Sequence, residues 1–522
     1  MHAMPARLRT FLTRHPIVRD ALLWAIPALV LGGVLRLLLL SYLPYAYWGS
    51  DSRSYFSFAH KLLTEAYISL DAKRRFFYPI LMAPIAALPG APLSWVAWAQ
   101  HALGLATLVP LAYLVRRSFF AWRWWIVPIT VLYAGMPIIL WYEHELLGET
   151  VFFAMLLCAF AGWVAWVSET RLERSRRLFW LFFVPFALFI LTKPSGRFAW
   201  PGILCGLVLV ACWRRLDWRR FAALGALMVA TLAVGSGKQG AWLLYTATFP
   251  LTRIETPLHA EYKTEIRDQV QTLQANINHY YREDEWPFTF LENPGAQDER
   301  PRWKALGKDE KLRKRIYMDL ALEGVRADPG MFLYLGWQRL VGSVNPSEFK
   351  EDRFTGGFYV ERFEHFYEEM QAKPGSPVRF AFALPRTGDL PPYSEFQRQL
   401  SPAPDGFAAR AVNGWVAAYL HAADIVRLPV KSGDAHSRSI LRARLTPLGW
   451  WLVAGAVLSL LPPYTRRLGV WTLVAASYAA GVFLVSQVNP RYFAPVWPVL
   501  VPLLAVPADM LARLLCWKSK RP

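Results

Sequence analysis

Residues 21–43 read ALLWAIPALVLGGVLRLLLLSYL, an apolar run that contains a single charged residue, Arg36. The run is longer than the apolar core of a signal peptide, which has about 7–15 residues, and no small-residue cleavage pattern follows it. Positive charge precedes it, as is typical of the cytoplasmic side of a first membrane span. The preceding basic residues are Arg7, Arg9, Arg14 and Arg19. The sequence therefore predicts a retained first membrane helix with a cytoplasmic N-terminus.

Similar runs recur along the chain and indicate a membrane protein. Of its 522 residues, 54% are hydrophobic and 18% are charged, and the mean hydropathy is +0.22. This composition excludes a cytosolic enzyme, a secreted disulfide scaffold and a disordered chain. An α-helical polytopic fold with about ten membrane spans is expected. The predicted spans lie near residues 21–43, 94–114, 124–142, 146–168, 178–192, 198–213, 221–245, 447–463, 468–487 and 492–515.

Basic residues set the expected orientation of these spans. The net charge of +20 lies in the hydrophobic parts, where 31 basic residues face 11 acidic ones, because residues 246–445 contain 27 of each sign. Arginine-rich turns follow alternate spans, which is typical of cytoplasmic loops and unlike a nucleic-acid-binding surface. Both termini are therefore expected to be cytoplasmic. The compact arginine-rich loops and the lack of secretory-pathway signals favour a bacterial plasma membrane.

This topology divides the chain into three parts. Residues 1–245 form an N-terminal membrane core, whose first external loop covers residues 44–77. Residues 246–445 form an external, periplasmic domain, and residues 446–522 form the C-terminal membrane helices.

The external domain is expected to be mainly α-helical. Its sequence has helical spacing at residues 262–282 and 308–326, whereas residues 374–404 are rich in proline and glycine and are expected to form loops. The apolar run at residues 331–344 is too short to span a bilayer and is expected to lie on the membrane surface or to dip into it.

Four basic residues depart from the cytoplasmic bias, since they lie near the predicted external ends of spans. They are Lys193, Arg197, Lys238 and Arg491. Cations at headgroup depth can converge on the phosphate of a lipid-linked substrate. The alternative is that each extends its charged group to ordinary lipid headgroups.

Asp51 is the best candidate for a general base. It lies eight residues beyond the first predicted span, where the aromatic and glycine-containing stretch at residues 47–52 brings a carboxylate to the outer bilayer surface. A carboxylate there can take a proton from an acceptor hydroxyl while a neighbouring cation holds a leaving phosphate. The alternative is that Asp51 caps a helix that begins at Ser52.

A second acidic group lies at the expected external end of spans three and four. It consists of Glu143, His144, Glu145 and Glu149. Two carboxylates and an imidazole can position an acceptor or hold a divalent metal ion. The zinc-protease pattern fails, because glycine stands at position 148 where the second histidine belongs. The alternative is a solvated loop with interfacial acids.

The sequence carries no nucleotide-binding motif. Gly235-Ser236-Gly237-Lys238 is similar to part of a phosphate loop, but Gln239 follows the lysine. A transferase of this kind therefore favours a lipid-borne donor.

Five short motifs, taken in order, resemble the GT-C membrane glycosyltransferases, particularly the bacterial branch related to protein O-mannosyltransferases and the aminoarabinose transferase of lipid A. The resemblance covers the membrane core. The motifs are Gly49-Ser50-Asp51, Phe77-Tyr78-Pro79-Ile80-Leu81, Gly148-Glu149-Thr150-Val151-Phe152-Phe153, Leu191-Thr192-Lys193-Pro194-Ser195-Gly196 and Asn489-Pro490-Arg491-Tyr492-Phe493-Ala494-Pro495.

The resemblance implies transfer of a sugar from a polyprenyl phosphate to a lipid, glycan or protein acceptor on the external face, with inversion at the anomeric carbon. Asp51 matches the catalytic acid of the first external loop, and Glu149 matches the acid that opens the fourth span. Lys193 and Arg491 match basic positions near the donor. A second acid often stands beside the catalytic one in this family, whereas serines flank Asp51 here, so metal dependence stays open.

Two other classes of function remain open from the sequence. A transporter or flippase for a lipid-linked anionic glycan also needs external cations, although the asymmetric arrangement of spans and the large external domain disfavour it. A non-catalytic envelope assembly protein would use the external domain to bind partners. The sequence names neither the sugar, the acceptor nor the oligomeric state.

Overall fold

The computed structural model describes most of the membrane core and separate parts of the remainder. The described residues are 10, 13–49, 51–66, 77–90, 92–213, 222–229, 240–278, 301–306, 309–344, 351–355, 363–364, 367–372, 379, 381–382, 384, 389–403, 405–428, 440–485 and 490–518.

The prediction of an α-helical polytopic membrane protein is confirmed. Within the described residues, six helical segments are long and apolar enough to cross a bilayer. They are Pro16–Tyr42 (α2), Pro92–Ser118 (α5, Pro92–Ala106, with α6, Leu108–Ser118), Glu149–Val167 (α9), Glu173–Thr192 (within α10, Leu172–Thr192), Thr465–Leu484 (η6, Thr465–Gly469, with α24, Val470–Val485) and Ala494–Cys516 (η7, Ala494–Val496, with α26, Trp497–Leu503, and α27, Val506–Lys518).

The remaining predicted spans are shorter, bent or only partly described. Two of them are short apolar helices, Ser195–Val210 (within η1, Pro194–Ala199, and α11, Trp200–Trp213) and Pro447–Ser459 (α23). A further short apolar helix, Phe77–Ala86 (α4), lies where no span was predicted. The span predicted at 221–245 includes residues 230–239, which lie outside the described residues. Within the described residues, length and composition therefore do not confirm the expected count of about ten.

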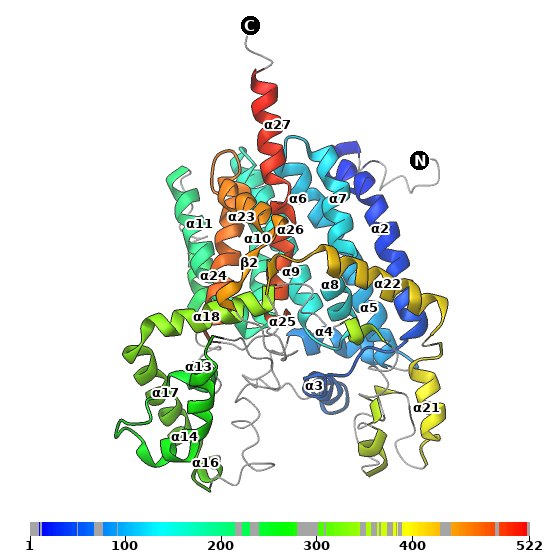
Figure 1. Ribbon diagram of the computed structural model, residues 1–522. Helices are drawn as coiled ribbons and strands as arrows, with labels where there is room; N and C mark the ends of the chain where they lie inside the picture. The colour runs from blue at the N-terminus through cyan, green and yellow to red at the C-terminus, as the bar shows by residue number, and fades with distance from the viewer. Residues whose placement is uncertain are drawn as a thin grey trace.

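The span predicted at 124–142 is broken into two helices, α7 (Trp122–Ala134) and α8 (Pro137–His144), which are bent by 50°. Gly135 and Pro137 explain the break, since proline cannot continue the hydrogen bonding of the preceding turn and glycine is a weak helix former. Counted as one span, the bent pair raises the number of described spans to seven. Helix α8 follows the break and lies near the end of the bundle at which the first loop and α3 (Ser52–Glu65) are found (Figure 1).

Helix α9 lies at the centre of the bundle and is apolar all round, so it is buried among its neighbours. Its closest partner is α10, because Gly162 lets the two backbones touch at Leu181. Gly202 does the same between α11 and α24, at Val474. These contacts set the spacing of α9 with α10 and of α11 with α24.

The beginning of α2 and the end of α27 lie at one end of the bundle, and the extramembrane helices lie at the other (Figure 1). A first group of these forms its own hydrophobic cluster around Tyr245, Trp303 and Tyr317. It consists of α13 (Gly240–Thr248), α14 (Ala260–Ala275), α16 (Pro301–Leu306) and α17 (Glu310–Ala327).

The chain then returns to the bundle. Helix α18 (Pro329–Val344) packs on α24, and Nη1 of Arg339 donates to the backbone oxygen of Phe483 over 3.2 Å. Helix α22 (Phe407–Ala422) packs on α2 and α8. Strand β1 (Val426–Arg427) pairs antiparallel with β2 (Arg444–Leu445), with Val426 opposite Leu445.

The helices predicted from spacing at 262–282 and 308–326 are represented by α14 and α17. The loop prediction for residues 374–404 is wrong at Tyr393–Leu400, which form the helix α21. This helix begins directly after Pro392, where proline is tolerated because the first helical turn has no internal acceptor for its amide. It buries Phe396 and Leu400 on one face.

Candidate functional site

Asp51 lies on a short loop that is held against the turn between α8 and α9. The backbone nitrogen of Tyr47 donates to the oxygen of His144 over 2.8 Å, and the nitrogen of Leu146 donates to the oxygen of Tyr47 over 2.9 Å. This parallel bridge fixes one side of the loop. The other side is fixed by Ser52, whose hydroxyl donates to the oxygen of Leu146 and accepts the amide of Gly49, each over 2.9 Å.

The alternative that Asp51 caps the following helix holds for its position but not for its side chain. Asp51 stands at the N-cap position of α3 (Ser52–Glu65), but its side chain makes no capping hydrogen bond. Its Oδ2 instead accepts from Nη1 of Arg491 over 3.2 Å. The carboxylate therefore faces the bundle's cations rather than the start of its own helix.

Four predicted site residues meet in what we call the ionic cluster, namely Asp51, Glu149, Lys193 and Arg491. Lys193 follows α10, and Arg491 lies in α25 (Pro490–Phe493). Both donate to the same oxygen, Oε1 of Glu149 at the start of α9. Three segments far apart in sequence thus deliver one carboxylate and two cations to one point, beside Asp51.

Exposure separates the members of the ionic cluster. Glu149 is fully buried, whereas the exposed fractions of the side chains rise from 11% for Lys193 to 18% for Arg491 and 26% for Asp51. Asp51 and the two cations are therefore partly accessible to solvent, whereas Glu149 contacts the cations from the interior. Among the described residues, Oε2 of Glu149 has no hydrogen-bond partner.

Lys193 remains a cation in this setting. Burial lowers the pKa of its amine to about 8, against the opposing attraction of Glu149. A pKa of about 8 leaves the amine mostly protonated at neutral pH. The ionic cluster thus offers two positive groups for an anion and one accessible carboxylate for a proton.

Glu145 lies between the ionic cluster and the first loop. Its Oε2 accepts from Nε1 of Trp141 over 3.0 Å, and a β-carbon at position 49 would lie 2.5 Å from its Oε1, so a larger residue there would displace this carboxylate. Burial raises the pKa of the Glu145 carboxyl to about 7, although Arg491 and Arg353 oppose this shift.

The raised pKa of Glu145 predicts a pH dependence of stability. Between its ordinary value of 4.5 and the folded value of about 7, the folded protein binds more protons than the unfolded chain. The stabilising contribution is therefore complete below the lower value and is lost as the pH rises through the upper one. Thermal unfolding in detergent should show a wild-type midpoint that falls between about pH 5 and about pH 8, and a smaller fall for Glu145→Gln. Equal falls for both proteins would contradict the prediction.

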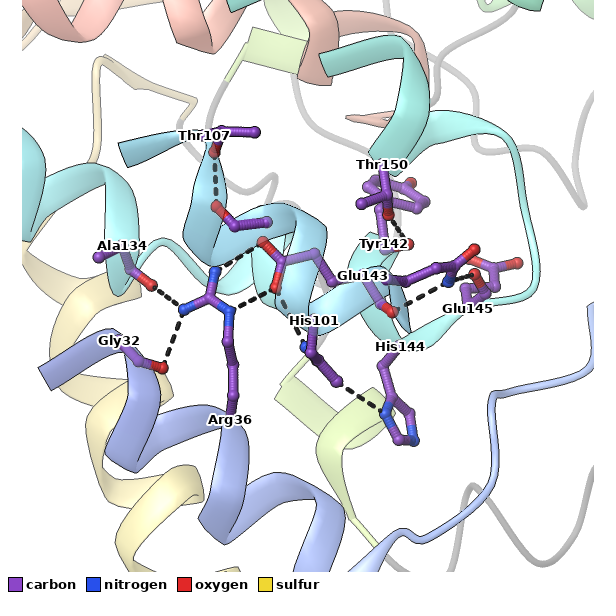
Figure 2. A network of polar contacts seen from close by, with 12 residues as sticks. Gly32, Arg36, His101, Thr107, Ala134, Tyr142, Glu143, His144, Glu145 and Thr150 are labelled. Carbon is purple, nitrogen blue, oxygen red and sulfur yellow. Dashed lines mark hydrogen bonds and ion pairs between the residues drawn. The ribbon is translucent and has the colours of Figure 1, made fainter. Parts of the chain in front are cut away.

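Glu143 and His144 belong to a second group, which we call the buried network and which also contains Arg36 and His101 (Figure 2). Arg36 holds Glu143 with two parallel hydrogen bonds of 2.6 Å. Nδ1 of His101 lies 3.0 Å from Oε2 of Glu143, and its Nε2 lies 3.2 Å from Nδ1 of His144. All four side chains are buried.

Several contributing residues were not identified from the sequence. Arg36, the single charged residue of the first apolar run, pairs with Glu143. Gln100 was not singled out, yet its amide donates to the backbone oxygens of Glu143 and Glu145 over 2.9 and 2.8 Å, and its Oε1 accepts from Tyr78 over 2.6 Å. The available signal was that Gln100 and His101 are polar residues within an apolar span, where such groups need partners.

The predicted external domain, residues 246–445, also reaches the site. Its 3-10 turn η4 (Glu351–Phe354) packs beside α22, and the hydroxyl of Tyr42 donates to the oxygen of Phe354 over 3.0 Å. Phe354 is buried edge-on against Trp141, and the guanidinium of Arg353 lies 6.0 Å from the centre of the same indole ring.

The remaining predicted residues lie elsewhere or outside the described part. Arg197 lies on η1, with its guanidinium 5.3 Å from the ring centre of Phe198. Lys238 lies outside the described residues. Within the described residues, no group of three His, Cys, Asp or Glu side chains is gathered closely enough to hold a metal ion.

No known family matches the sequence, and no curated protein is similar to it. Among solved structures, the chain is similar to the archaeal oligosaccharyltransferase AglB from Archaeoglobus fulgidus in complex with an inhibitory peptide and a dolichol-phosphate, at 12% identity and a TM-score of 0.40. It is also similar to the oligosaccharyltransferase of that organism in the apo form, at 11% and 0.41. Each match covers 95% of this chain and 51% of the other, so the chain spans about half the length of these proteins. The likeness is remote, and the function is inferred from the side chains.

Proposed function

We propose that this protein is an inverting membrane glycosyltransferase, which moves a sugar from a polyprenyl-phosphate donor to an acceptor hydroxyl. The ionic cluster is its active site. The end of the bundle that carries α14, α16, α17 and α21 faces the periplasm of a bacterial cell, and both termini are cytoplasmic.

One observation supports this proposal above the others. Lys193 and Arg491 both hold the fully buried Glu149, and the accessible Asp51 lies on the far side of Arg491. A base and a pair of phosphate-binding cations thereby share one location at the end of the membrane helices. An inverting transfer uses both kinds of group, a base for the acceptor hydroxyl and cations for the leaving phosphate.

In the proposed reaction, the acceptor oxygen attacks the anomeric carbon of the donor sugar while Asp51 takes the proton of the attacking hydroxyl. The bond between that carbon and the phosphate oxygen breaks, and its electron pair leaves with the polyprenyl phosphate. Lys193 and Arg491 stabilise the added negative charge. Arg197 and Lys238 are proposed to add positive charge on the donor side. Glu149 acts as a positioning residue for the two cations, since its burial keeps it from the substrate.

The acceptor is proposed to enter from the side of η4. Arg353 and Phe354 lie against Trp141. Trp141 in turn contacts Glu145, next to the ionic cluster. The external domain would therefore form one wall of the acceptor path.

The experiment that tests the function is a transfer assay with the full-length protein in liposomes. The donors are polyprenyl phosphates that carry radiolabelled hexoses or pentoses, and the acceptors are envelope glycolipids, glycans and proteins. Wild type should release polyprenyl phosphate and form one glycosylated product with an inverted anomeric carbon, while Asp51→Asn serves as the blank. Movement of intact donor across the bilayer without cleavage would identify a flippase, and absence of both activities would favour an assembly protein.

A further inference from the structure

The buried network lies inside the bundle and has no access to substrate. Besides Glu143, Arg36 contacts the backbone oxygens of Gly32 and Ala134 over 3.0 and 3.1 Å (Figure 2). Glycines leave the space for this pair: a β-carbon at Gly32 would lie 2.9 Å from Nη1 of Arg36, and one at Gly104 would overlap the Glu143 carboxylate. The site is thus shaped for an ion pair between α2 and α8, with α5 on the third side.

A buried ion pair holds three helices together only at a large cost in desolvation free energy. Removing two charges from water costs several kcal/mol per ion, and apolar side chains of similar volume often stabilise a protein as well or better. In a membrane segment the cost of an unsatisfied ion is no smaller. The arrangement is therefore better explained by what it fixes in space than by stability.

The ion pair fixes residues 143–146, the segment against which the loop of Asp51 packs. The side chain of Glu143 is anchored by Arg36 and His101, and the backbone on both sides of His144 is held by the amide of Gln100. The next contacts outward are the two hydrogen bonds of Tyr47 with His144 and Leu146. From there, Gly49 and Ser52 close the turn in which Asp51 lies.

We propose that Arg36, His101 and Glu143 are positioning residues of the active site, which set the placement of Asp51 through the bridge between Tyr47 and residues 144–146. This inference rests on the proposed function. It assigns a role in turnover to a group that never touches the substrate.

The test compares one charge-breaking variant with one apolar replacement. Glu143→Gln should lower both stability and kcat. The double variant Arg36→Met with Glu143→Leu should keep the wild-type unfolding midpoint, because it fills the same space without buried charge, and should still lose kcat by about 10- to 100-fold through misplacement of the base. The KM for the donor should change by less than about 3-fold in both, since Lys193 and Arg491 are untouched.

Asp509→Asn is the matched control. Asp509 is also fully buried and accepts from Tyr464 over 2.6 Å and from Arg513 over 3.0 Å, but it lies in α27, toward the opposite end of the bundle. It should lose stability without a specific loss of kcat. In a double-mutant cycle, Glu143→Gln should add little to the kcat loss of Asp51→Asn, whereas additive losses would mean that the two residues act separately.

Amide hydrogen exchange gives a readout that does not depend on sugar transfer. Peptides that contain Tyr47 and Leu146 should exchange at least about 10-fold faster in Glu143→Gln and in the double variant than in wild type and Asp509→Asn. Unchanged exchange at these amides, or full kcat in the stable double variant, would overturn the inference. A wild-type protein without transfer activity would overturn the proposed function instead, and the exchange rates would still decide whether the network holds the loop.

Discussion

Asp51→Asn is expected to lower kcat for sugar transfer by about 10²- to 10⁴-fold, the range over which a positioned general base contributes. Asparagine has nearly the same shape and can still accept a hydrogen bond from Arg491, but it cannot take the proton of the attacking hydroxyl. Donor binding should therefore change little. The measurement is the single-turnover rate at saturating donor in liposomes, with donor affinity determined separately by equilibrium binding.

Asp20→Asn is a close control for this variant. Asp20 is also part-exposed and paired with an arginine, Arg116 at 3.3 Å, but it lies near the start of α2, at the other end of the bundle. It should retain the wild-type rate. If Asp51→Asn transfers sugar as fast as Asp20→Asn, then Asp51 is not the base and the proposed mechanism fails.

The convergence of Asp51, Glu149, Lys193 and Arg491 could be anticipated because topology constrains it. Each residue lies at or near the end of an apolar helix or span, and the alternation of charged turns puts those ends on one side of the membrane. Residues at the same depth and on the same side of a compact bundle therefore lie close to one another. Their roles in the reaction remain proposals that rest on this geometry.

The buried network could not be anticipated in the same way. Arg36 and Glu143 are 107 residues apart, and the predicted span at 124–142, which ends just before Glu143, is broken by the 50° bend between α7 and α8. Hydropathy records the apolar run but not its direction after a break. The sequence therefore predicts one group of Glu143, His144, Glu145 and Glu149. In the structure, Glu143 and His144 belong to the buried network, Glu145 lies beside Trp141, and Glu149 belongs to the ionic cluster.

The external domain was the least predictable part for a different reason. Its helices α18 and α22 return to pack on α24, α2 and α8. Spacing within a segment indicates a helix but not which surface that helix covers. The position of Arg353 beside Trp141 follows from this return and has no signature in the sequence.

Glu149→Gln is expected to lower the free energy of unfolding by about 3–5 kcal/mol, as removal of one partner from a buried ion pair does. Glutamine keeps the shape of the side chain but leaves Lys193 and Arg491 without the carboxylate that both contact. The loss of about 3–5 kcal/mol is expected without reduction because Glu149 is completely buried, so water does not screen the interaction. Unfolding by denaturing detergent in mixed micelles measures this loss.

A surface pair supplies the comparison that makes this test decisive. Glu169 lies 3.4 Å from Arg174, whose side chain is 58% exposed, and Glu169→Gln should cost less than about 1 kcal/mol, as is usual for exposed pairs. A Glu149→Gln variant no less stable than Glu169→Gln would mean that the two cations do not depend on Glu149. In that case Arg491 would keep its place beside Asp51 without the carboxylate of Glu149. A large loss of stability with donor binding also weakened would instead tie the buried carboxylate, the two cations and the phosphate site into one unit.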